Sequence, residues 1–388
     1  MSAGDVILPG ATLGVLGGGQ LGRMWVQKAQ AMGYFTVVLD ADPTSPAGLV
    51  SHHHIRTGYE DAQGLAEMAR LCAAVTTEFE NVPAASLDLL AQSLRVSPAG
   101  GAVAIAQDRA AEKAHFVRCG VPVAPHAVIA TPEELAAVSA DLLPGILKTA
   151  RMGYDGKGQV RVQTAADLAG AWERLGRVPC VLEKMLPLAH ECSVIVARGR
   201  DGSMVHLPVQ RNLHRDGILA VTEVFEGNLP AAQTHQALTA AKSVADGLNY
   251  VGVLCVEFFV LQDGSLVVNE IAPRPHNSGH YSQDACDVSQ FELQLRTMTG
   301  LPLVQPRLHS PTIMLNLLGD LWFAQGDQPV TPDWAQVLAL PGCHLHLYGK
   351  RDAKPGRKMG HLNVTGATPE AVRATALQAA AILGIAPF

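Results

Sequence analysis

Residues 253–271 read VLCVEFFVLQDGSLVVNEI, two apolar runs that flank the turn residues Asp263 and Gly264. An Asp-Gly pair between such runs is a strong signal for a β-hairpin with a two-residue turn. In that register Glu257 lies directly opposite Glu270, and the apolar neighbours on both strands indicate a buried sheet. The sequence therefore predicts two carboxylates that face each other away from water.

Two like charges placed so close together repel strongly where water is scarce, so the pair needs a neutralising partner. Two carboxylates, together with phosphate oxygens and water, form a typical ligand set for Mg²⁺. We therefore predict that Glu257 and Glu270 hold one or two Mg²⁺ ions. A proton shared by the pair, or a slip of the strand register that separates them, are the alternatives.

Short apolar runs bounded by turn residues occur upstream of this hairpin and predict a β-rich central region. They cover residues 145–147, 178–182, 193–197 and 204–209, and residues 200–203 (RDGS) predict a second hairpin with a two-residue turn. Thr131 followed by Pro132 predicts the start of a helix, and Thr368 followed by Pro369 predicts the start of the last one.

The first hundred residues alternate strand patterns (11–16, 35–39 and 73–76) with helix patterns (21–32 and 62–71), which predicts βαβ units and a parallel sheet. The alternation ends near residues 96–98, and residues 120–122 (GVP) mark the start of another unit. We expect an α/β and α+β protein with a Rossmann-like domain at residues 1–105, a central domain at 106–300 with a subdomain at about 145–190, and a small β-rich C-terminal domain at 301–388.

Residues 17–22 (GGGQLG) follow an apolar strand and precede a helix, and Asp40 ends the next strand. This matches the dinucleotide fingerprint, but its physical content is a backbone that can approach an anion at the N-terminus of a helix. Any phosphate would suit such a loop. A nicotinamide-dependent dehydrogenase is one alternative that the motif leaves open.

Composition excludes several classes of protein. The formal charge is −6, from 29 basic and 35 acidic residues, so no broad positive field favours nucleic acid. The seven cysteines are scattered and no apolar run reaches the ~18 residues that a membrane span needs, so we expect a soluble cytoplasmic protein with no membrane partner. Residues 52–54 (HHH) point in different directions on either a strand or a helix and predict surface positions, not a metal site.

Five motifs in a fixed order resemble those of the ATP-grasp enzymes of purine biosynthesis, and within them the N5-carboxyaminoimidazole ribonucleotide synthetase (PurK) family. The motifs are GGGQLGRM at 17–24, Lys148 with GYDGKGQ at 153–159, NLHRDGIL at 212–219, NEIAPRPHNSGH at 269–280 and PGRKMGHLN at 355–363. The resemblance runs over nearly the whole chain and implies an ATP-grasp domain at its centre.

The resemblance implies that ATP lies between two β-rich subdomains, with residues 153–159 closing over the triphosphate as a lid. The ATP-binding residues that it implies are Arg109, Lys148, Gly153, Tyr154, Asp155, Gly156, Lys157, Gly158, Gln159, Glu183, Lys184, Met185, Leu186, Glu191, His214, Asn269 and Glu270. Among these, residues 183–186 would form the hinge that reads the adenine edge. Glu257 and Glu270 would hold Mg²⁺, in agreement with the hairpin argument.

The resemblance also implies a ribonucleotide site and a reaction. The substrate-binding residues would be Gln20, Leu21, Glu80, Asn277, Lys350, Arg357 and Lys358, and the catalytic ones Asp155, Arg274 and His276. The implied reaction is the ATP- and bicarbonate-dependent carboxylation of 5-aminoimidazole ribonucleotide through carboxyphosphate, carried out by a homodimer. The related alternative is a formate-dependent glycinamide ribonucleotide transformylase, which shares this layout of motifs.

Overall fold

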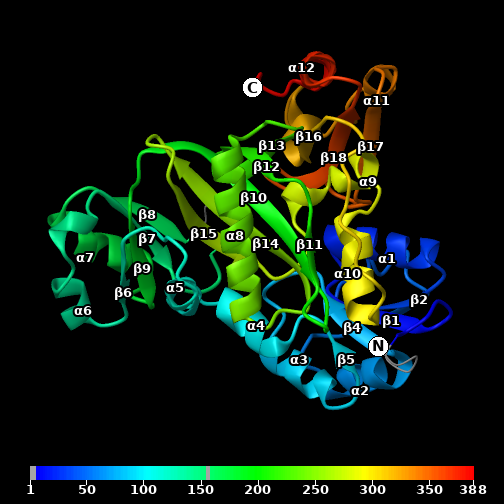
Figure 1. Ribbon diagram of the computed structural model, residues 1–388, viewed down its shortest axis with the longest axis horizontal. Coiled ribbons are helices and arrows are strands. Elements are labelled where there is room, and N and C mark those ends of the chain that lie inside the picture. Colours follow the sequence, from blue (N-terminus) through cyan, green and yellow to red (C-terminus); the bar gives the residue numbers. More distant parts are fainter. Residues whose placement is uncertain (1–5, 154–157) are drawn as a thin grey trace.

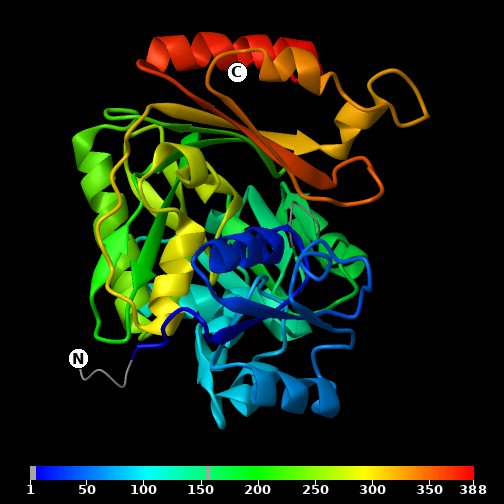
Figure 2. The same ribbon diagram turned by 90° about the vertical axis from the view of Figure 1, so that its right-hand side faces the viewer.

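The computed structural model describes residues 6–153 and 158–388, and its described residues form three β-sheets. Figures 1 and 2 show an N-terminal unit at the base, a smaller sheet to one side, and a large central sheet that continues into the C-terminal segment. No helix within the described ranges is long and apolar enough to cross a membrane.

The N-terminal unit is a parallel sheet in the order β3-β2-β1-β4-β5, as the alternating pattern predicted. Its strands are β1 (Thr12–Leu16), β2 (Phe35–Leu39), β3 (His53–Ile55), β4 (Ala74–Thr77) and β5 (Arg95–Val96), and its helices are α1 (Gln20–Ala31), α2 (Ala62–Leu71) and α3 (Ala84–Ala91). The carboxyl ends of β1, β2 and β4 meet at one edge. This edge is where ligands bind in open parallel sheets.

Helices α4 (Gly100–Ala106) and α5 (Arg109–Arg118) lead into an antiparallel sheet in the order β6-β9-β7-β8. The elements of this lid sheet are β6 (His126–Ile129), α6 (Pro132–Ala136), η1 (Ala140–Leu142), β7 (Gly145–Thr149), β8 (Gln159–Val162), α7 (Ala165–Arg174) and β9 (Cys180–Lys184). Thr131 caps α6 in a capping box with Glu134, which confirms the predicted helix start. Because β6 belongs to this sheet, the subdomain begins earlier than residue 145.

The central sheet is antiparallel, in the order β15-β14-β10-β12-β13-β16-β18-β17, with β11 beside β10. Its strands are β10 (Leu188–Arg198), β11 (Met204–His206), β12 (Gln210–Arg215), β13 (Ile218–Val224), β14 (Gly252–Leu261), β15 (Leu266–Ala272), β16 (Thr312–Leu318), β17 (Cys343–Leu347) and β18 (Lys358–Thr365). The β-rich C-terminal segment is present as predicted, but its strands extend this sheet instead of forming one of their own.

Two helices cover opposite faces of the central sheet. Alternate residues of β10 divide between them: Val194 packs in the cluster of α8 (Ala231–Gly247), whereas Ile195 packs with Leu293 of α10 (Gln290–Thr299). Helix α10 also contacts α1 and β4, so it fixes the N-terminal sheet against the central one. The remaining elements are η2 (Asn277–Gly279), α9 (Ser282–Ala285), η3 (Gly319–Phe323), α11 (Trp334–Leu338) and α12 (Pro369–Leu383), the last of which lies over the C-terminal strands (Figure 2).

The hairpin between β14 and β15 pairs Glu257 with Glu270, which confirms the predicted pairing. The predicted two-residue turn is wrong, because Leu261 N–H donates to the Ser265 carbonyl at 2.8 Å across a three-residue loop. Gly264, with φ +84°, supplies the left-handed residue that such loops need. A bulge next to Glu257 offsets the extra residue and restores the register. The predicted turn at residues 200–203 is likewise a three-residue loop, closed by Gly199 N–H on the Ser203 carbonyl at 2.8 Å.

Candidate active site

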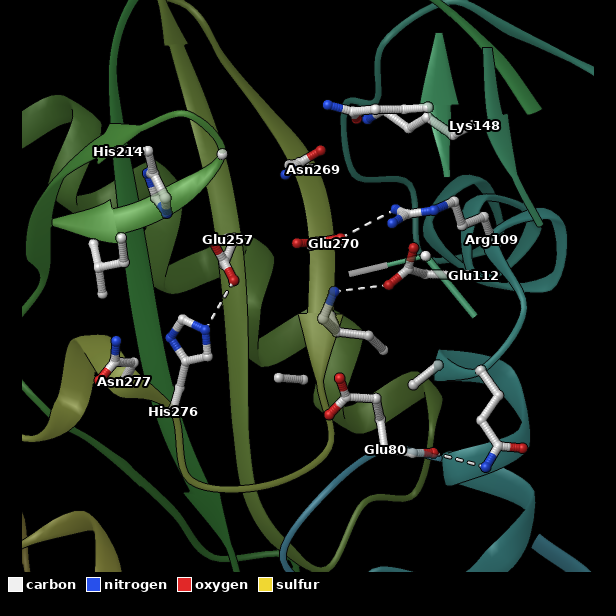
Figure 3. A pocket seen from close by; sticks show the side chains of 18 of the residues that line it. Glu80, Arg109, Glu112, Lys148, His214, Glu257, Asn269, Glu270, His276 and Asn277 are labelled. Atoms are coloured by element: carbon white, nitrogen blue, oxygen red, sulfur yellow. Dashed lines mark hydrogen bonds and ion pairs between the residues drawn. The ribbon is translucent and has the colours of Figure 1, made fainter. Parts of the chain in front are cut away.

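A cavity of about 330 Å³ lies between the lid sheet and the central sheet, and Figure 3 shows it from close by. It collects side chains from α5, β7, β10, β12, β14 and β15 and from the loop after β15. The residues singled out in the sequence that line it are Glu80, Arg109, Lys148, Gly153, Gln159, Glu191, His214, Glu257, Asn269, Glu270, Arg274, His276, Asn277 and Lys358. Residues that are far apart in the chain therefore converge on one site.

Each of the two paired carboxylates is matched with a side chain that can carry positive charge. His276 Nε2 lies 3.1 Å from Glu257 Oε1, and Arg109 donates to Glu270 Oε2 at 3.1 Å, as the dashed lines in Figure 3 show. Burial alone would raise the pKa of Glu257, but His276 and, to a smaller extent, His214 and Arg274 lower it to about 2. Glu257 is thus held as an anion, ready to bind a cation.

The oxygen-rich surroundings of Glu257 fit a divalent ion. One ligand atom each from Glu191, His214 and Glu257 lies within 4.8 Å of the others. Glu191 Oε2 is 2.9 Å from His214 Nδ1, and although burial would lower the pKa of His214, Glu191 raises it. Carboxylates on neighbouring strands are the donor type that Mg²⁺ prefers. This cluster includes Glu257 but not Glu270, so the predicted Mg²⁺ role of the pair stays a prediction, supported by their pairing across β14 and β15.

A buried hydrogen-bond network orients His276 beside Glu257. The Ser278 backbone N–H donates to His276 Nδ1 at 3.3 Å, so this nitrogen acts as an acceptor and Nε2 faces the carboxylate. Ser278 Oγ lies 2.8 Å from Ser193 Oγ, which donates to Gln210 Oε1 at 2.9 Å. The ring is therefore fixed from below by side chains that are fully buried.

Two lysines flank Glu183 under the floor of the cavity. Lys148 donates to Glu183 Oε2 at 3.1 Å, and Lys113 Nζ lies 3.4 Å from Glu183 Oε1. Burial would raise the pKa of Glu183, but the two ammonium groups lower it. Neighbouring Glu112 lacks such strong compensation, so burial raises its pKa to about 8. The sequence reasoning missed Glu112 and Lys113, because a charged pair on a helix is ordinarily exposed.

The predicted adenine hinge, residues 183–186, does not line the cavity. The Lys184 amide donates to the Pro125 carbonyl at 2.9 Å, and the Met185 amide donates to the Pro144 carbonyl at 2.9 Å. Glu183 is held by its two lysines, and Leu186 accepts from the Leu188 amide at 2.8 Å. The Lys184 and Met185 amides are therefore engaged by the chain itself, and the adenine-hinge role of residues 183–186 stays a prediction.

Part of the predicted lid can be placed. Gly153 and Gln159 line the cavity, and the Gly158 carbonyl accepts from the Thr149 amide at 2.9 Å. Gly158 has φ +70°, and a Cβ there would lie 2.7 Å from Thr149 Oγ1, so glycine is required. Tyr154, Asp155, Gly156 and Lys157 lie outside the described residues.

A second cavity of about 430 Å³ opens between the N-terminal sheet and the C-terminal strands. The predicted substrate residues that line it are Gln20, Leu21, Glu80, Asn277, Lys350, Arg357 and Lys358. It shares Glu80, Arg274, His276, Asn277 and Lys358 with the first cavity. The two cavities therefore meet at a common wall.

That wall contains one strong ion pair and one group without a partner. Arg274 pairs with Glu80 through Nε, and although burial would raise the pKa of Glu80, Arg274 lowers it to about 2. The Nδ2 group of buried Asn277 has no hydrogen-bond partner within the described part of the chain. A buried side-chain amide ordinarily has a hydrogen-bond partner, so we expect a bound ligand to accept from Asn277.

Three amides of the glycine motif are engaged by carboxylates of the chain itself. Gly18 N–H donates to Asp40 Oδ2 at 2.7 Å, while Gly19 N–H and Gly22 N–H donate to the two oxygens of Glu78 at 2.7 Å and 3.0 Å. The sequence-based expectation of an anion at this loop is met by carboxylates of the chain itself. This arrangement speaks against the dinucleotide alternative, and Glu78 had not been singled out.

Three family models match the chain: the ATP-grasp domain over residues 114–291, the ribonucleotide synthetase preATP-grasp domain over residues 10–107, and the phosphoribosylaminoimidazole carboxylase C-terminal domain over residues 312–375. A relative from Brucella melitensis, named N5-carboxyaminoimidazole ribonucleotide synthase, is 42% identical over 361 residues, which cover 91% of this chain and 96% of the relative. The chain belongs to the N5-carboxyaminoimidazole ribonucleotide synthase family.

Solved structures of this synthase family share the whole architecture. The Staphylococcus aureus N5-carboxyaminoimidazole synthetase complexed with ADP is 36% identical, with a TM-score of 0.89 and 98% of each chain covered. An Aspergillus clavatus N5-carboxyaminoimidazole synthase, in complex with ADP and 5-aminoimidazole ribonucleotide, is 33% identical, with a TM-score of 0.87 over 96% of this chain and 98% of that one. The resemblance read from the sequence motifs is confirmed.

Proposed function

We propose that this chain is an ATP-dependent ligase that carboxylates the amine of 5-aminoimidazole ribonucleotide with bicarbonate, in purine biosynthesis. The observation that carries this proposal is the shared wall of the two cavities. One cavity presents carboxylates and cations suited to a magnesium nucleotide, and the other presents Lys350, Arg357 and Lys358, which suit a phosphate ester. Relatives that bind ADP and the ribonucleotide support the assignment.

Residues of the first cavity take the ATP roles in this proposal. Among the residues that line it, Lys148 and Arg109 would face the phosphates, Glu191 and His214 would bind the ribose, and Asn269 and Glu270 would lie near the metal. Glu257 and Glu270 would hold Mg²⁺, and the bound ion would supply shielding of the phosphate charge. Residues 183–186 keep the proposed hinge role through their backbone groups other than the Lys184 and Met185 amides, which already have acceptors.

The proposed reaction has two steps, a phosphoryl transfer followed by a carboxyl transfer. An oxygen of bicarbonate attacks the γ-phosphorus of ATP, the bond to ADP breaks, and carboxyphosphate forms. The substrate amine then attacks the carboxyl carbon, phosphate leaves, and the amine gives up a proton to a base. Arg274, at the shared wall, stabilises the anionic oxygens of the intermediate, and the lid keeps water away from it.

Two residues are candidates for the base in this scheme. His276 is placed by the buried network, with Nε2 toward Glu257, whereas Asp155 belongs to the predicted lid. The variants Asp155→Asn and His276→Asn distinguish the two candidates. The variant that lacks the base is expected to release phosphate from ATP without forming a matching amount of product. Full ligase turnover in Asp155→Asn removes that residue from consideration.

The deciding experiment measures phosphate release from ATP and bicarbonate with and without 5-aminoimidazole ribonucleotide. Strong stimulation by this nucleotide, together with formation of the carbamate product, supports the proposal. Stimulation only by glycinamide ribonucleotide with formate would assign the chain to the transformylase reaction. Omission of bicarbonate is the matched control, because it removes the acyl donor and leaves every protein contact unchanged.

The oligomeric state and location belong to the same proposal. A homodimer is expected, and sedimentation of the full chain measures it directly. All seven cysteines are free thiols, which suits the reducing cytoplasm.

A further inference from the structure

Three glycines at the β1–α1 junction, Gly17 and Gly19 in the loop and Gly22 in the first turn of α1, surround the side chain of Glu78. A Cβ atom added to Gly17 would lie 2.3 Å from Glu78 Cγ, and one added to Gly19 would lie 2.5 Å from Glu78 Oε1. Gly22 donates its amide to the same carboxylate at 3.0 Å. The loop is therefore rich in glycine because it wraps an internal carboxylate, and a bound pyrophosphate is not needed to explain it.

Glu78 occupies the place that a ligand takes in related sheets. It directly follows β4, so it lies at the carboxyl ends of the parallel strands, beside the N-terminus of α1. In dinucleotide-binding sheets, the pyrophosphate sits on the amides of this loop and in the field of this helix. Glu78 is 9% exposed and accepts two backbone hydrogen bonds there. A carboxylate in this position satisfies the amides and leaves no room for a phosphate.

The first residues of α1 depend on this contact. Gln20 and Leu21 lie between Gly19 and Gly22, whose amides Glu78 holds, and both line the second cavity. Three cations of that cavity, Lys350, Arg357 and Lys358, come from the C-terminal segment on the opposite side. A ligand with one phosphate can place that phosphate on these three cations. In a ligand with two phosphates, the second one would point at the glycine loop and meet Glu78.

We propose that the carboxyl group of Glu78 is a built-in hydrogen-bond acceptor that closes the glycine loop to nucleotide phosphates and positions Gln20 and Leu21 for a ribonucleotide with a single phosphate. Glu78 acts as a positioning residue and takes no part in the chemistry. The positioning of Gln20 and Leu21 for a ribonucleotide rests on the proposed function, whereas the closing of the loop by Glu78 is independent of it.

Chemical rescue tests the positioning role. In Glu78→Ala, two buried amides lose their acceptor, so the KM for 5-aminoimidazole ribonucleotide is expected to rise about tenfold or more, while the KM for ATP changes less than twofold. Acetate at tens of millimolar fills the vacated space and lowers the ribonucleotide KM again, whereas sodium chloride at the same ionic strength does not. Acetate is used because formate is a substrate of the transformylase reaction.

Glu78→Gln is the matched control for shape. Its amide oxygen can accept one hydrogen bond, but its NH₂ group faces the other backbone donor, so the ribonucleotide KM rises. Acetate does not restore it, because the side chain still fills the space. A wild-type ribonucleotide KM in either variant, or equal rescue by acetate and chloride in Glu78→Ala, would overturn the proposal.

A thermal-unfolding cycle tests the loop without any substrate. Gly19 has φ −76° and ψ −161°, which alanine adopts readily, so Gly19→Ala is unfavourable only through its contact with Glu78. We expect Gly19→Ala to lower the unfolding midpoint by about 5 °C in the wild-type chain and by much less in the Glu78→Ala background. Gly101→Ala, whose Cβ meets nothing within 4 Å, is the control and leaves the midpoint unchanged or raised.

The two measurements separate the possible failures. Additive effects of Gly19→Ala and Glu78→Ala on the unfolding midpoint would refute the role of Glu78 in the loop, whatever the enzyme's substrate. A strongly non-additive cycle in a chain that does not respond to 5-aminoimidazole ribonucleotide would retain the loop inference and refute the proposed function.

Discussion

Lys113 carries an ammonium group with no exposed surface, and replacing it with methionine is expected to lower the free energy of unfolding by about 3–4 kcal/mol. Methionine has a similar length and no charge, so the change removes electrostatic contacts with little change in volume. Lys113 joins α5 to both sheets that enclose the first cavity, because it contacts Glu183 on β9 and donates to the Asn269 carbonyl on β15 at 2.8 Å.

The magnitude follows from what remains after the substitution. Breaking a buried ion pair costs roughly 3–5 kcal/mol when the partner is left alone. Here Glu183 keeps Lys148 at 3.1 Å, which places the loss near the lower end of that range. The Asn269 carbonyl also loses its donor, which adds about 1 kcal/mol. Glu183→Met should cost more, because it leaves two buried ammonium groups without a carboxylate between them.

Calorimetry and denaturant unfolding at pH 7.5 measure the effect, with an expected fall of about 10 °C in the unfolding midpoint. Lys242→Met, at an exposed position on α8, is the matched control and should change little. The KM for ATP should also rise, because Lys113 fixes Glu183 and the backbone at Asn269. A loss below 1 kcal/mol, or a larger loss for Lys113→Met than for Glu183→Met, would refute the reasoning.

Two further predictions concern the metal and the histidines. Glu270→Gln is expected to reduce ATP-dependent phosphate release at least ~100-fold and to raise the Mg²⁺ concentration needed for activity. Exposed Glu60→Gln is the control. An unchanged Mg²⁺ dependence in Glu270→Gln would remove Glu270 from the metal site. Burial holds the pKa values of His280 and His361 well below the ordinary 6.5, so the unfolded chain binds more protons and stability falls as pH drops below ~6.5. Unfolding free energies at pH 5.5 and 7.5 should differ less in His361→Asn than in the wild type, and equal differences would contradict this origin.

From the sequence alone, strands β1, β2 and β4 and helices α1 and α2 could be predicted, with β2 and α2 matching the predicted bounds, whereas β3, α3 and β5 were missed. The predicted elements follow from periodicity and capping within a few residues, which a chain carries locally. Helix α8 was missed, because its core-facing residues are mostly alanine and give little contrast with the exposed face. Helix α10 was also missed; it is buried nearly all round, so its polar residues face protein on two sides.

The candidate site divides in the same way. The pairing of Glu257 with Glu270 could be predicted from turn and strand chemistry, although two local deviations cancel to produce it. Lys350, Arg357 and Lys358 were predicted through the family resemblance, and all three line the second cavity.

Only the tertiary structure decided which groups become the partners of the buried charged side chains. Glu78 meets amides 56 and 59 residues away, and Lys113 meets a carbonyl 156 residues away. Hydrogen-bond patterns within a turn or helix are fixed by neighbouring residues, whereas the partner of a buried charge is fixed by how whole sheets and helices pack. For that reason the motif predicted an anion on the glycine loop, and only the fold revealed that a side chain of the protein itself accepts hydrogen bonds from the loop amides.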